Sequence, residues 1–221
     1  MAVVEAHHLH RFFRTGDEEV AALCDINLAL DAGEMVALIG MSGSGKSTLL
    51  SCLAGLDEPD GGHVVLAGQR ISHHPEEERA RLRARHIGLL MQSGTLIDHL
   101  TLWENIALQQ ELGGKVDTTA IEPLLQLLDM SSHAHKLPRL LSGGEVARGG
   151  LAVALAAHAS LLLCDEPTAE VDAETEVTIL AEIRRRCQTG AAALIATHND
   201  AVARHADRIV EISDGRIVSH A

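Results

Sequence analysis

A glycine-rich segment between residues 40 and 47 carries the residue types that bind phosphate. It reads GMSGSGKS and matches the pattern G-x-x-x-x-G-K-[ST], in which glycines let the backbone turn tightly and point successive N–H groups at phosphate oxygens. Lys46 is expected to reach the β- and γ-phosphates of a nucleotide, and Ser47 to supply a hydroxyl ligand to Mg²⁺. The residues predicted to surround the phosphates are Gly40, Met41, Ser42, Gly43, Ser44, Gly45, Lys46, Ser47 and Thr48.

A second chemical signal is a run of apolar residues that ends in two acids. Leu161–Cys164 is followed by Asp165 and Glu166. Mg²⁺ beside a phosphate loop needs an acidic partner at the end of a strand, and Asp165 is that candidate. Glu166 is expected near the γ-phosphate, where a carboxylate can orient or deprotonate water. An acid after a strand is by itself more often a helix cap or a solvated turn, and it is the phosphate loop that favours the catalytic interpretation.

These residues need strands and helices to position them. Short apolar runs bounded by turn residues predict buried strands of a parallel sheet over Met35–Ile39, Leu161–Cys164 and Ala192–Ala196. Helical patterns are found at Lys46–Ala54, Leu102–Leu112, Thr118–Leu128, Glu145–Ala157 and Ala173–Arg186, the last with Asp172 as a plausible N-cap. Alternation of strands and helices predicts the α/β fold class.

Other segments are predicted to pair as antiparallel strands. Val3–Phe12, Val20–Leu30 and Val64–Gln69 are separated by turn-forming residues. Near the end of the chain, Arg208–Ile212 and Arg216–Val218 flank Asp214-Gly215, which is typical of a hairpin with a two-residue turn. The stretch from about residue 93 to 157 is mostly helical and lies between two strand signals, which indicates a subdomain inserted into the α/β core.

Composition narrows the classes of function. The 221 residues carry 18 basic and 31 acidic side chains, a formal charge of −13 that repels a nucleic-acid backbone. Aromatic residues make up 1% of the chain and none is Tyr, which argues against the base-stacking surfaces of single-strand binders. The four cysteines form no C-x-x-C pair, which fits a reducing compartment, and no apolar run is long enough to predict a membrane-spanning helix. The histidines near residues 7–10, 73–74 and 133–135 lack carboxylate or cysteine partners at useful spacing, so a metal site there is the minor alternative.

Further motifs, in one order along the chain, resemble those of ABC-transporter ATPases. Leu141–Glu145 reads LSGGE and is similar to the family's signature LSGGQ, and Asp165–Thr168 reads DEPT as that family does. Gln92 stands at the expected Q-loop position, and Thr197–Asp200 resembles the switch-histidine segment. Ala169–Asp172 is similar to the family's D-loop.

The resemblance covers the whole chain. Phe13 stands where an aromatic residue of the family stacks on adenine. The compact length and the lead-in Gly33–Ala37 resemble the lipoprotein-releasing, macrolide-exporting and cell-division ATPase subunits. The implied fold is a P-loop NTPase core with an N-terminal antiparallel β subdomain and an inserted α-helical subdomain. Residues 1–221 would form a single domain, with the core in 1–92 and 158–221 and the helical subdomain in about 93–157.

The resemblance also implies the site and its cofactors, which are ATP and Mg²⁺. The implied catalytic residues are Glu166, His198, Gln92 and Lys46, and the implied metal contacts are Ser47, Gln92 and Asp165. Besides the phosphate loop, nucleotide contacts are implied for Phe13, Ser142, Gly143, Gly144, Glu145 and Asp172.

The LSGGE segment has a physical reading of its own. A Ser-Gly-Gly run before a helix exposes backbone N–H groups at a positive helix end, which suits a second phosphate site. Held away from its own phosphate loop by the inserted helices, it would face ATP on a second subunit, so a homodimer or paired ATPase subunit is expected. Alone, the segment would more often be a helix start with Ser142 as N-cap. A transmembrane permease on another chain is the implied partner, with this chain cytoplasmic and peripheral to the inner face of the membrane.

Three departures from the family pattern follow the signature. Glu145 replaces Gln, and a carboxylate near triphosphate is repulsive unless a cation compensates it, for which Arg148 is the candidate. Gly149 and Gly150 interrupt a helix at a cost of about 1 kcal/mol each relative to alanine, so the helix is expected to be soft. Val153 replaces an arginine that is common in the family.

Two functions are weighed. The first is an ATPase that works as a dimer on a transmembrane transporter, with 93–101 beside Gln92 docking a short cytoplasmic helix of that partner. The alternative is an ATP-binding scaffold that signals to a membrane complex with little or no transport. ABC-type ATPases of DNA repair or translation are disfavoured, because the long coiled-coil insertion or second cassette of such relatives is not in this sequence.

Overall fold

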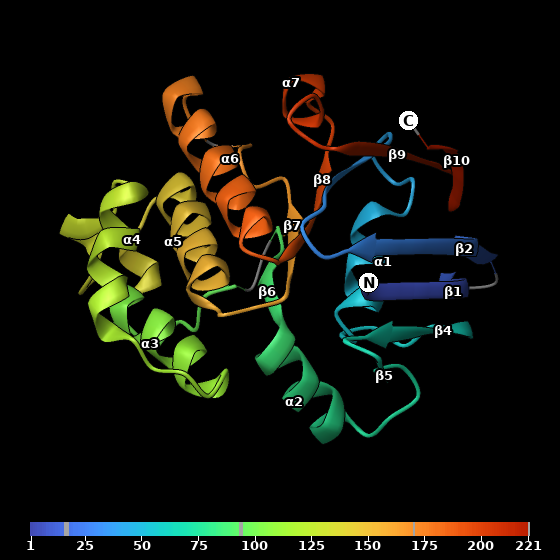
Figure 1. The fold of residues 1–221 in the computed structure, drawn as a ribbon, viewed down its shortest axis with the longest axis horizontal. Coiled ribbons are helices and arrows are strands. Elements are labelled where there is room, and N and C mark those ends of the chain that lie inside the picture. Colours follow the sequence, from blue (N-terminus) through green and yellow to red (C-terminus); the bar gives the residue numbers. More distant parts are fainter. Residues whose placement is uncertain (16–17, 93–94, 170, 221) are drawn as a thin grey trace.

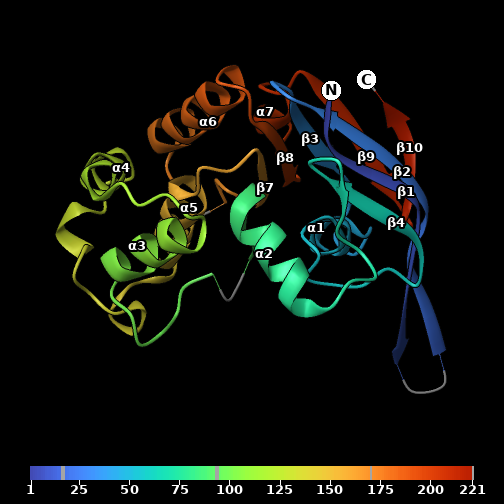
Figure 2. The same ribbon diagram turned by 60° about the horizontal axis from the view of Figure 1, so that its bottom comes forward.

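The computed structural model describes residues 1–15, 18–92, 95–169 and 171–220. It contains an antiparallel sheet, a mostly parallel sheet and a group of helices on the side of the parallel sheet away from the antiparallel one (Figures 1 and 2). The predicted fold class, an α/β core with an N-terminal antiparallel part and inserted helices, is confirmed.

The antiparallel sheet has the order β2-β1-β4-β5, formed by β1 (Ala2–Thr15), β2 (Glu18–Asp31), β4 (Gly61–Leu66) and β5 (Gln69–Arg70). Its buried side chains include Val4, Leu9 and Leu30, all 1% exposed or less. The single strand predicted over Val64–Gln69 is wrong. Residues 67 and 68 form a turn with positive φ that separates β4 from β5, because the chain reverses there to pair Leu66 with Gln69.

The second sheet positions the chemistry. Its order is β10-β9-β3-β8-β7-β6, with β3 (Met35–Ile39), β6 (Ile87–Leu90), β7 (Leu161–Asp165), β8 (Ala192–Thr197), β9 (Arg208–Ser213) and β10 (Arg216–His220). All neighbours are parallel except the hairpin of β9 and β10, which was predicted. Parallel strands bring their carboxyl ends to one edge of the sheet, so the residues after β3, β6, β7 and β8 meet there.

Each face of this sheet packs into a different hydrophobic core. In β8, Leu194 belongs to the core shared with the antiparallel sheet, whereas Ala193 and Ile195 belong to the core shared with the helices. This alternation is the two-residue period of a strand buried on both faces. Helix α1 (Lys46–Leu53) lies in the first core, between the two sheets.

The remaining helices frame these cores. They are α2 (Glu76–His86), α3 (Leu102–Leu112), α4 (Ile121–Leu127), α5 (Gly143–Ala156), α6 (Ala173–Gln188) and α7 (Asp200–Ala203), with short 3₁₀ turns η1 (Thr118–Ala120), η2 (Ser131–His133) and η3 (Pro138–Leu140). Helices α3, α4 and α5 form the group seen at the left of Figure 1. The helix predicted over Thr118–Leu128 is instead η1 followed by α4. Pro123 has no N–H to donate to the residue 119 carbonyl, so the regular helix starts later.

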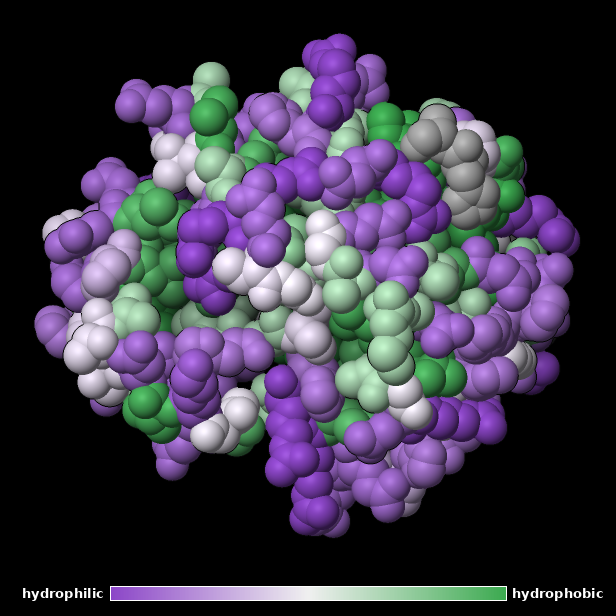
Figure 3. Space-filling model, in the orientation of Figure 1, coloured by the Kyte–Doolittle hydropathy of each residue, from purple (hydrophilic) through white to green (hydrophobic). Residues whose placement is uncertain are grey.

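The surface mixes residue types. On the face drawn in Figure 3, hydrophobic residues are interspersed among hydrophilic ones. Such scattered exposure is normal for a folded chain. Across the described ranges, none of the helices has the length and apolar character needed to cross a membrane.

Candidate functional site

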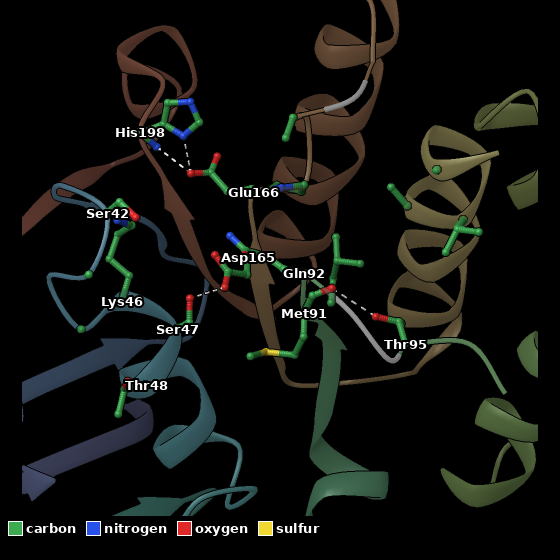
Figure 4. A pocket seen from close by; sticks show the side chains of 18 of the residues that line it. Ser42, Lys46, Ser47, Thr48, Met91, Gln92, Thr95, Asp165, Glu166 and His198 are labelled. Carbon is green, nitrogen blue, oxygen red and sulfur yellow. Dashed lines mark hydrogen bonds and ion pairs between the residues drawn. The ribbon is translucent and has the colours of Figure 1, made fainter. Parts of the chain in front are cut away.

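A cavity of about 1380 Å³ lies between the loop after β3 and the first turns of α5 (Figure 4). Residues at or just after the ends of β6, β7 and β8 line it, so residues expected to form the site come together at this edge of the sheet. The expected site residues that line it are Phe13, Ser42, Gly43, Gly45, Lys46, Ser47, Thr48, Gln92, Gly143, Asp165, Glu166 and His198. Seven other expected site residues do not line the cavity, namely Gly40, Met41, Ser44, Ser142, Gly144, Glu145 and Asp172.

The phosphate loop turns from β3 into α1. Gly45 caps the helix with a φ of 109°, and a Cβ there would lie 2.5 Å from the Ala22 carbonyl oxygen, so both conformation and space require glycine. Lys46 Nζ donates to the carbonyl oxygens of Gly40 and Met41, at 2.7 and 3.0 Å. The ammonium is therefore held across the loop, at the helix N-terminus that attracts anions.

Ser47 and Asp165 meet across the sheet edge, 118 residues apart in sequence. Ser47 Oγ donates to Asp165 Oδ2 at 2.6 Å. The Asp165 side chain is buried, and its Oδ1 has no hydrogen-bond partner in the described part of the chain. Burial raises the pKa of this carboxyl, which the Ser47 hydrogen bond only partly offsets. A hydroxyl and an orphaned carboxylate oxygen side by side are a donor set that suits Mg²⁺.

Glu166 is oriented by three donors from the segment after β8. Its Oε2 accepts from Thr197 Oγ1 at 3.1 Å, and its Oε1 accepts from the His198 N–H at 3.0 Å. His198 Nδ1 lies 2.6 Å from the same Oε1. The Glu166 backbone has a φ of 52°, a left-handed conformation that costs about 1–3 kcal/mol for a residue with a side chain. The backbone of Glu166 is therefore strained at the point where its side chain lines the cavity.

Gln92 follows β6 and is exposed on the cavity wall. Three residues on, the described chain resumes at Thr95, whose Oγ1 donates to the Met91 carbonyl oxygen at 3.3 Å. Ser93 and Gly94, the start of the expected docking segment, lie outside the described residues.

Phe13 projects from β1 at the cavity rim with 39% of its surface exposed. The Arg11 guanidinium lies 4.7 Å from the ring centroid, a cation–π contact. Asp57 and Asp60 hold Arg11 by ion pairs of 2.8 and 3.1 Å. Sequence reasoning missed Arg11, although a spacing of two along a strand already places residues 11 and 13 on one face.

The LSGGE segment forms the start of α5. Ser142 is the N-cap, and it exchanges hydrogen bonds with Glu145 in a capping box: Ser142 N–H to Oε2 at 2.7 Å, and Glu145 N–H to Ser142 Oγ at 3.4 Å. The other carboxylate oxygen pairs with His133 Nε2 at 2.9 Å. The expected compensation of Glu145 by Arg148 is wrong, because Arg148 points to the cavity wall, where its Nε is buried without a hydrogen-bond partner in the described ranges.

Helix α5 continues without a break through Gly149 and Gly150. The expected softness concerns the stability of the helix and stays a prediction. A Cβ on Gly149 would lie 3.1 Å from Leu102 Cδ1. A Cβ on Gly150 would lie 3.1 Å from both Leu90 Cδ1 and Thr95 Cβ. The glycines therefore let α3 and the segment after Gln92 approach the helix closely, and this packing supports the helix where propensity does not.

Asp172 is the N-cap of α6, as predicted. Its carboxylate accepts from the N–H groups of Glu174 and Thr175 at 3.0 and 2.9 Å. The Thr175 backbone bond is the largest cause of the lowered pKa of this carboxyl. Glu170, in the middle of the D-loop-like segment, lies outside the described residues.

Comparisons with known proteins agree with this geometry. The sequence pattern of the family described as ABC transporter matches residues 23–169. The macrolide export ATP-binding/permease protein MacB of Burkholderia pseudomallei (strain 1710b) is 39% identical over 211 residues, 94% of this chain and 32% of the relative. MacB of Salmonella choleraesuis (strain SC-B67) is 38% identical over 220 residues, 98% of this chain and 34% of the relative. The chain spans about a third of the length of these curated relatives.

Solved structures extend the likeness to the fold. The ATP-binding cassette MJ0796, in a dimeric post-hydrolysis state bound to ADP and Pi, superposes with a TM-score of 0.93 at 29% identity, covering 99% of this chain and 97% of that one. A second dimeric structure of MJ0796, described as a bacterial ABC transporter cassette, gives 0.93 at 28% identity over the same shares.

Proposed function

Because this chain belongs to the ABC transporter family as its ATP-hydrolysing cassette, we propose that it works as half of a nucleotide-sandwich dimer and drives a transmembrane partner. The observation that carries the proposal is the pair of Ser47 and Asp165 beside Lys46, with one buried carboxylate oxygen of Asp165 that has no hydrogen-bond partner among the described residues. That arrangement suits a Mg²⁺-bound triphosphate whose phosphates lie on the N-terminus of α1.

Each part of the triphosphate has a candidate contact. Backbone N–H groups of 40–48 surround the phosphates, and Lys46 exchanges the carbonyls of Gly40 and Met41 for β- and γ-phosphate oxygens. Ser47, Asp165 and Gln92 would hold Mg²⁺. When bound, the ion would supply positive charge that offsets the negative charge on the phosphates as the bond breaks. Adenine stacks on the face of Phe13 opposite Arg11.

Hydrolysis needs a water aimed at the γ-phosphate and a group to take its proton. Glu166 is that group, since three donors fix its carboxylate at the end of β7. His198, 75% exposed at its side chain, reaches the γ-phosphate with its other ring nitrogen while Nδ1 stays on Glu166. The two residues act as a unit in which the histidine orients the base.

The second half of the site comes from another copy or a paired subunit. In that complex Ser142, Gly143 and Gly144 at the start of α5 bind the ATP held by the phosphate loop of the first subunit, and Glu145 and Asp172 lie at the same interface. The N-terminal N–H groups of α5 and its dipole supply the attraction. Support comes from the dimeric state of MJ0796, the relative bound to ADP and Pi.

A transmembrane partner completes the machine. The relatives named MacB are described as ATP-binding/permease proteins, and this chain matches about a third of their length. The proposed dock is the described part of the segment after Gln92, where Ile97 is 38% exposed and Leu96 and Leu100 are half-buried. The chain would then lie at the cytoplasmic face of the membrane, held there by its partner. Cysteines placed at residues 97 and 100 should crosslink to cytoplasmic loops of that partner, and crosslinks to lipid alone would contradict the dock.

The decisive experiment uses Glu166→Gln. The variant keeps Lys46, Ser47 and Asp165, so ATP still binds, but hydrolysis falls by about 10² or more because the base is gone. A closed dimer should then accumulate with ATP and Mg²⁺, and size-exclusion chromatography measures it. The parent chain, which turns ATP over, and the variant with ADP are the controls. A variant that stays monomeric at saturating ATP, or hydrolyses as fast as the parent, contradicts the proposal.

A further inference from the structure

We propose that protonated His133 is a positioning residue of the ATP-binding end of α5: it neutralises Glu145 so that Ser142–Gly144 can accept the triphosphate on a second subunit. The inference rests on the proposed nucleotide-sandwich dimer and adds to it a pH dependence. It addresses a residue that neither the phosphate loop nor the LSGGE pattern points to.

The contact is built from two elements. His133 ends η2, and its Nε2 lies 2.9 Å from Oε1 of Glu145 in the first turn of α5. Both side chains are largely enclosed, with 17% of His133 and 23% of Glu145 exposed. The remaining carboxylate oxygen, Oε2, accepts from the Ser142 N–H at 2.7 Å. One carboxylate thus joins the histidine to the residue that begins the phosphate-binding turn.

The loop that carries His133 is fixed in place. The first N–H groups of α3 donate to it, from Leu102 to the Lys136 carbonyl at 3.0 Å and from Trp103 to the Ala134 carbonyl at 2.8 Å. These two hydrogen bonds tie the loop that carries His133 to the start of α3. The ion pair therefore helps to set the orientation of the capping box.

The carboxylate of Glu145 is charged at neutral pH. The Ser142 N–H is the largest cause of its lowered pKa, and the positive charges of His133 and Lys136 lower it further. An uncompensated negative charge in the first turn would repel an incoming triphosphate. Paired with imidazolium, the same carboxylate leaves the helix end nearly neutral and lets its N–H groups dominate.

Each ring nitrogen of His133 lies within reach of a side-chain oxygen, Nε2 of Glu145 Oε1 and Nδ1 of Ser132 Oγ. Its Nδ1 lies 3.0 Å from Ser132 Oγ, a hydroxyl that can accept, so both ring nitrogens can donate in the imidazolium form. Lys136 follows on the same loop. Helix α3 packs there through Trp103, whose ring lies against that of His135. Helix α3 also contributes Glu104, and the charge of His135 is one of the causes that lower the pKa of this carboxyl. From α4, the titratable group is Glu122, which accepts from Gln126. Glu145 is the acid that pairs with the ring.

The expected pH dependence has a definite sign. Histidine is the side chain whose charge ordinarily changes between about pH 5 and 8, and the positive form prevails at low pH. ATP-driven dimerisation should therefore weaken as pH rises, because Glu145 loses its counter-charge. The test uses the Glu166→Gln background, in which ATP is retained, and measures the ATP concentration at half-dimerisation between about pH 6 and 8.5.

Four variants in that background separate the explanations. The parent should need about tenfold more ATP at the high end of the range, the order of effect of one charged hydrogen bond. His133→Arg keeps a permanent charge and should flatten the profile to within about twofold, and His133→Gln should behave at every pH as the parent does at high pH. Adding Glu145→Gln to His133→Gln removes the charge that needs compensation and should restore dimerisation. His135→Gln, on the same loop, is the matched control and should keep the slope of the parent.

The outcomes distinguish this inference from the proposed dimer. A Glu166→Gln chain that never dimerises overturns both. Dimerisation that occurs but is the same for His133→Gln and the parent overturns the inference alone, as does a slope that persists in His133→Arg. Melting temperatures of all variants exclude loss of fold as the cause, because a purely structural role would shift them without changing the dependence on ATP.

Discussion

The two halves of the proposed ATP site are built by different means. The strand-end half is positioned by backbone next to the parallel sheet: Asp165 ends β7 and Glu166 follows it, whereas Lys46 and Ser47 begin α1 after the loop that leaves β3. The α5 half, formed by Ser142–Gly144 and Glu145, is positioned by side chains: a capping box, an ion pair to His133 and close packing around two glycines. The first half follows the motif residue by residue, and the second departs from it.

The difference shows where sequence changes can be absorbed. A residue at a strand end is fixed by hydrogen bonds on both sides, so a change there alters chemistry rather than position. A helix end held by caps can exchange one set of side chains for another, as Glu145 with His133 shows. Substitutions in the strand-end half should therefore affect the reaction most, and substitutions in the α5 half should affect dimerisation and stability by smaller amounts.

The largest effect is expected for Lys46→Ala. The ammonium crosses the phosphate loop by hydrogen bonds to Gly40 and Met41, and its loss removes the main cation for the transferred phosphate. Hydrolysis should fall by about 10³ or more, and ATP binding should weaken. Phosphate release and nucleotide affinity measure this, with the melting temperature as the control for fold. Undiminished turnover in a folded variant would contradict the assignment of the strand-end half to the ATP site.

Asp165→Asn should separate stability from function. Burial raises the pKa of Asp165 above its ordinary value of 3.8, so the folded chain holds this proton more tightly than the unfolded chain does. Stability on this account is greatest below that value and falls as pH rises through the raised pKa, which leaves a penalty at neutral pH. The amide removes the charge, and the nucleotide-free protein should gain about 1 kcal/mol, a rise of about 2–4 °C in melting temperature.

The same variant should lose hydrolysis, since it removes the carboxylate whose negative charge favours Mg²⁺ at this position. Ser47→Ala is the matched comparison: it also removes a metal contact but leaves the buried charge of Asp165 without its hydrogen bond. It should lower the melting temperature. If both variants move the melting temperature in the same direction, burial of the charge is not the cause.

Ser142→Ala tests the α5 half. Loss of the N-cap hydroxyl should cost about 1 kcal/mol of stability. Thr101→Ala is the matched control, because Thr101 and Glu104 form the same capping box at the start of α3. Both variants should lower the melting temperature by similar amounts, but only Ser142→Ala should raise the ATP concentration needed for dimerisation in the Glu166→Gln background. Equal behaviour in both measurements would confine the role of Ser142 to the fold.

The contrast between the halves also explains what sequence reasoning could predict. The sequence predicts that Ser47 and Asp165 lie together, because a phosphate loop and an acid at the end of a parallel strand meet at the same edge of the sheet. In the structure, Ser47 Oγ lies 2.6 Å from Asp165 Oδ2. The pairing of His133 with Glu145 could not be predicted from the sequence. It depends on how η2 packs against α5, and the segment between them has no repeating pattern that indicates this packing. The left-handed backbone of Glu166 was likewise invisible, because Glu carries no conformational signal of the kind glycine gives. The predicted resemblance to macrolide-exporting ATPase subunits is confirmed, because the relatives named MacB are described as macrolide export proteins.

The smallest effect is a difference between Gly149→Ala and Gly150→Ala, and its sign tests whether the close packing of α5 matters for the segment after Gln92. Alanine favours a helix over glycine by about 1 kcal/mol at either position. At Gly149 the new Cβ meets Leu102 Cδ1 at 3.1 Å and Leu96 Cδ1 at 3.3 Å, both ends of flexible side chains that can move.

At Gly150 the obstacle is Thr95, whose Cβ and Cγ2 both lie 3.1 Å from the new atom. Thr95 cannot rotate freely, because its Oγ1 is bonded to the Met91 carbonyl next to Gln92. Gly149→Ala should therefore raise the melting temperature by about 2–4 °C, whereas Gly150→Ala should leave it unchanged or lower it. Turnover should fall only in Gly150→Ala, since displacing Thr95 shifts the chain beside Gln92. Thr95→Ser deletes the Cγ2 methyl and keeps the hydroxyl. Combined with Gly150→Ala, it should recover part of the lost turnover and part of the lost melting temperature. Equal gains in stability with unchanged turnover in both alanine variants would mean that the contact between α5 and Thr95 does not position the Gln92 segment.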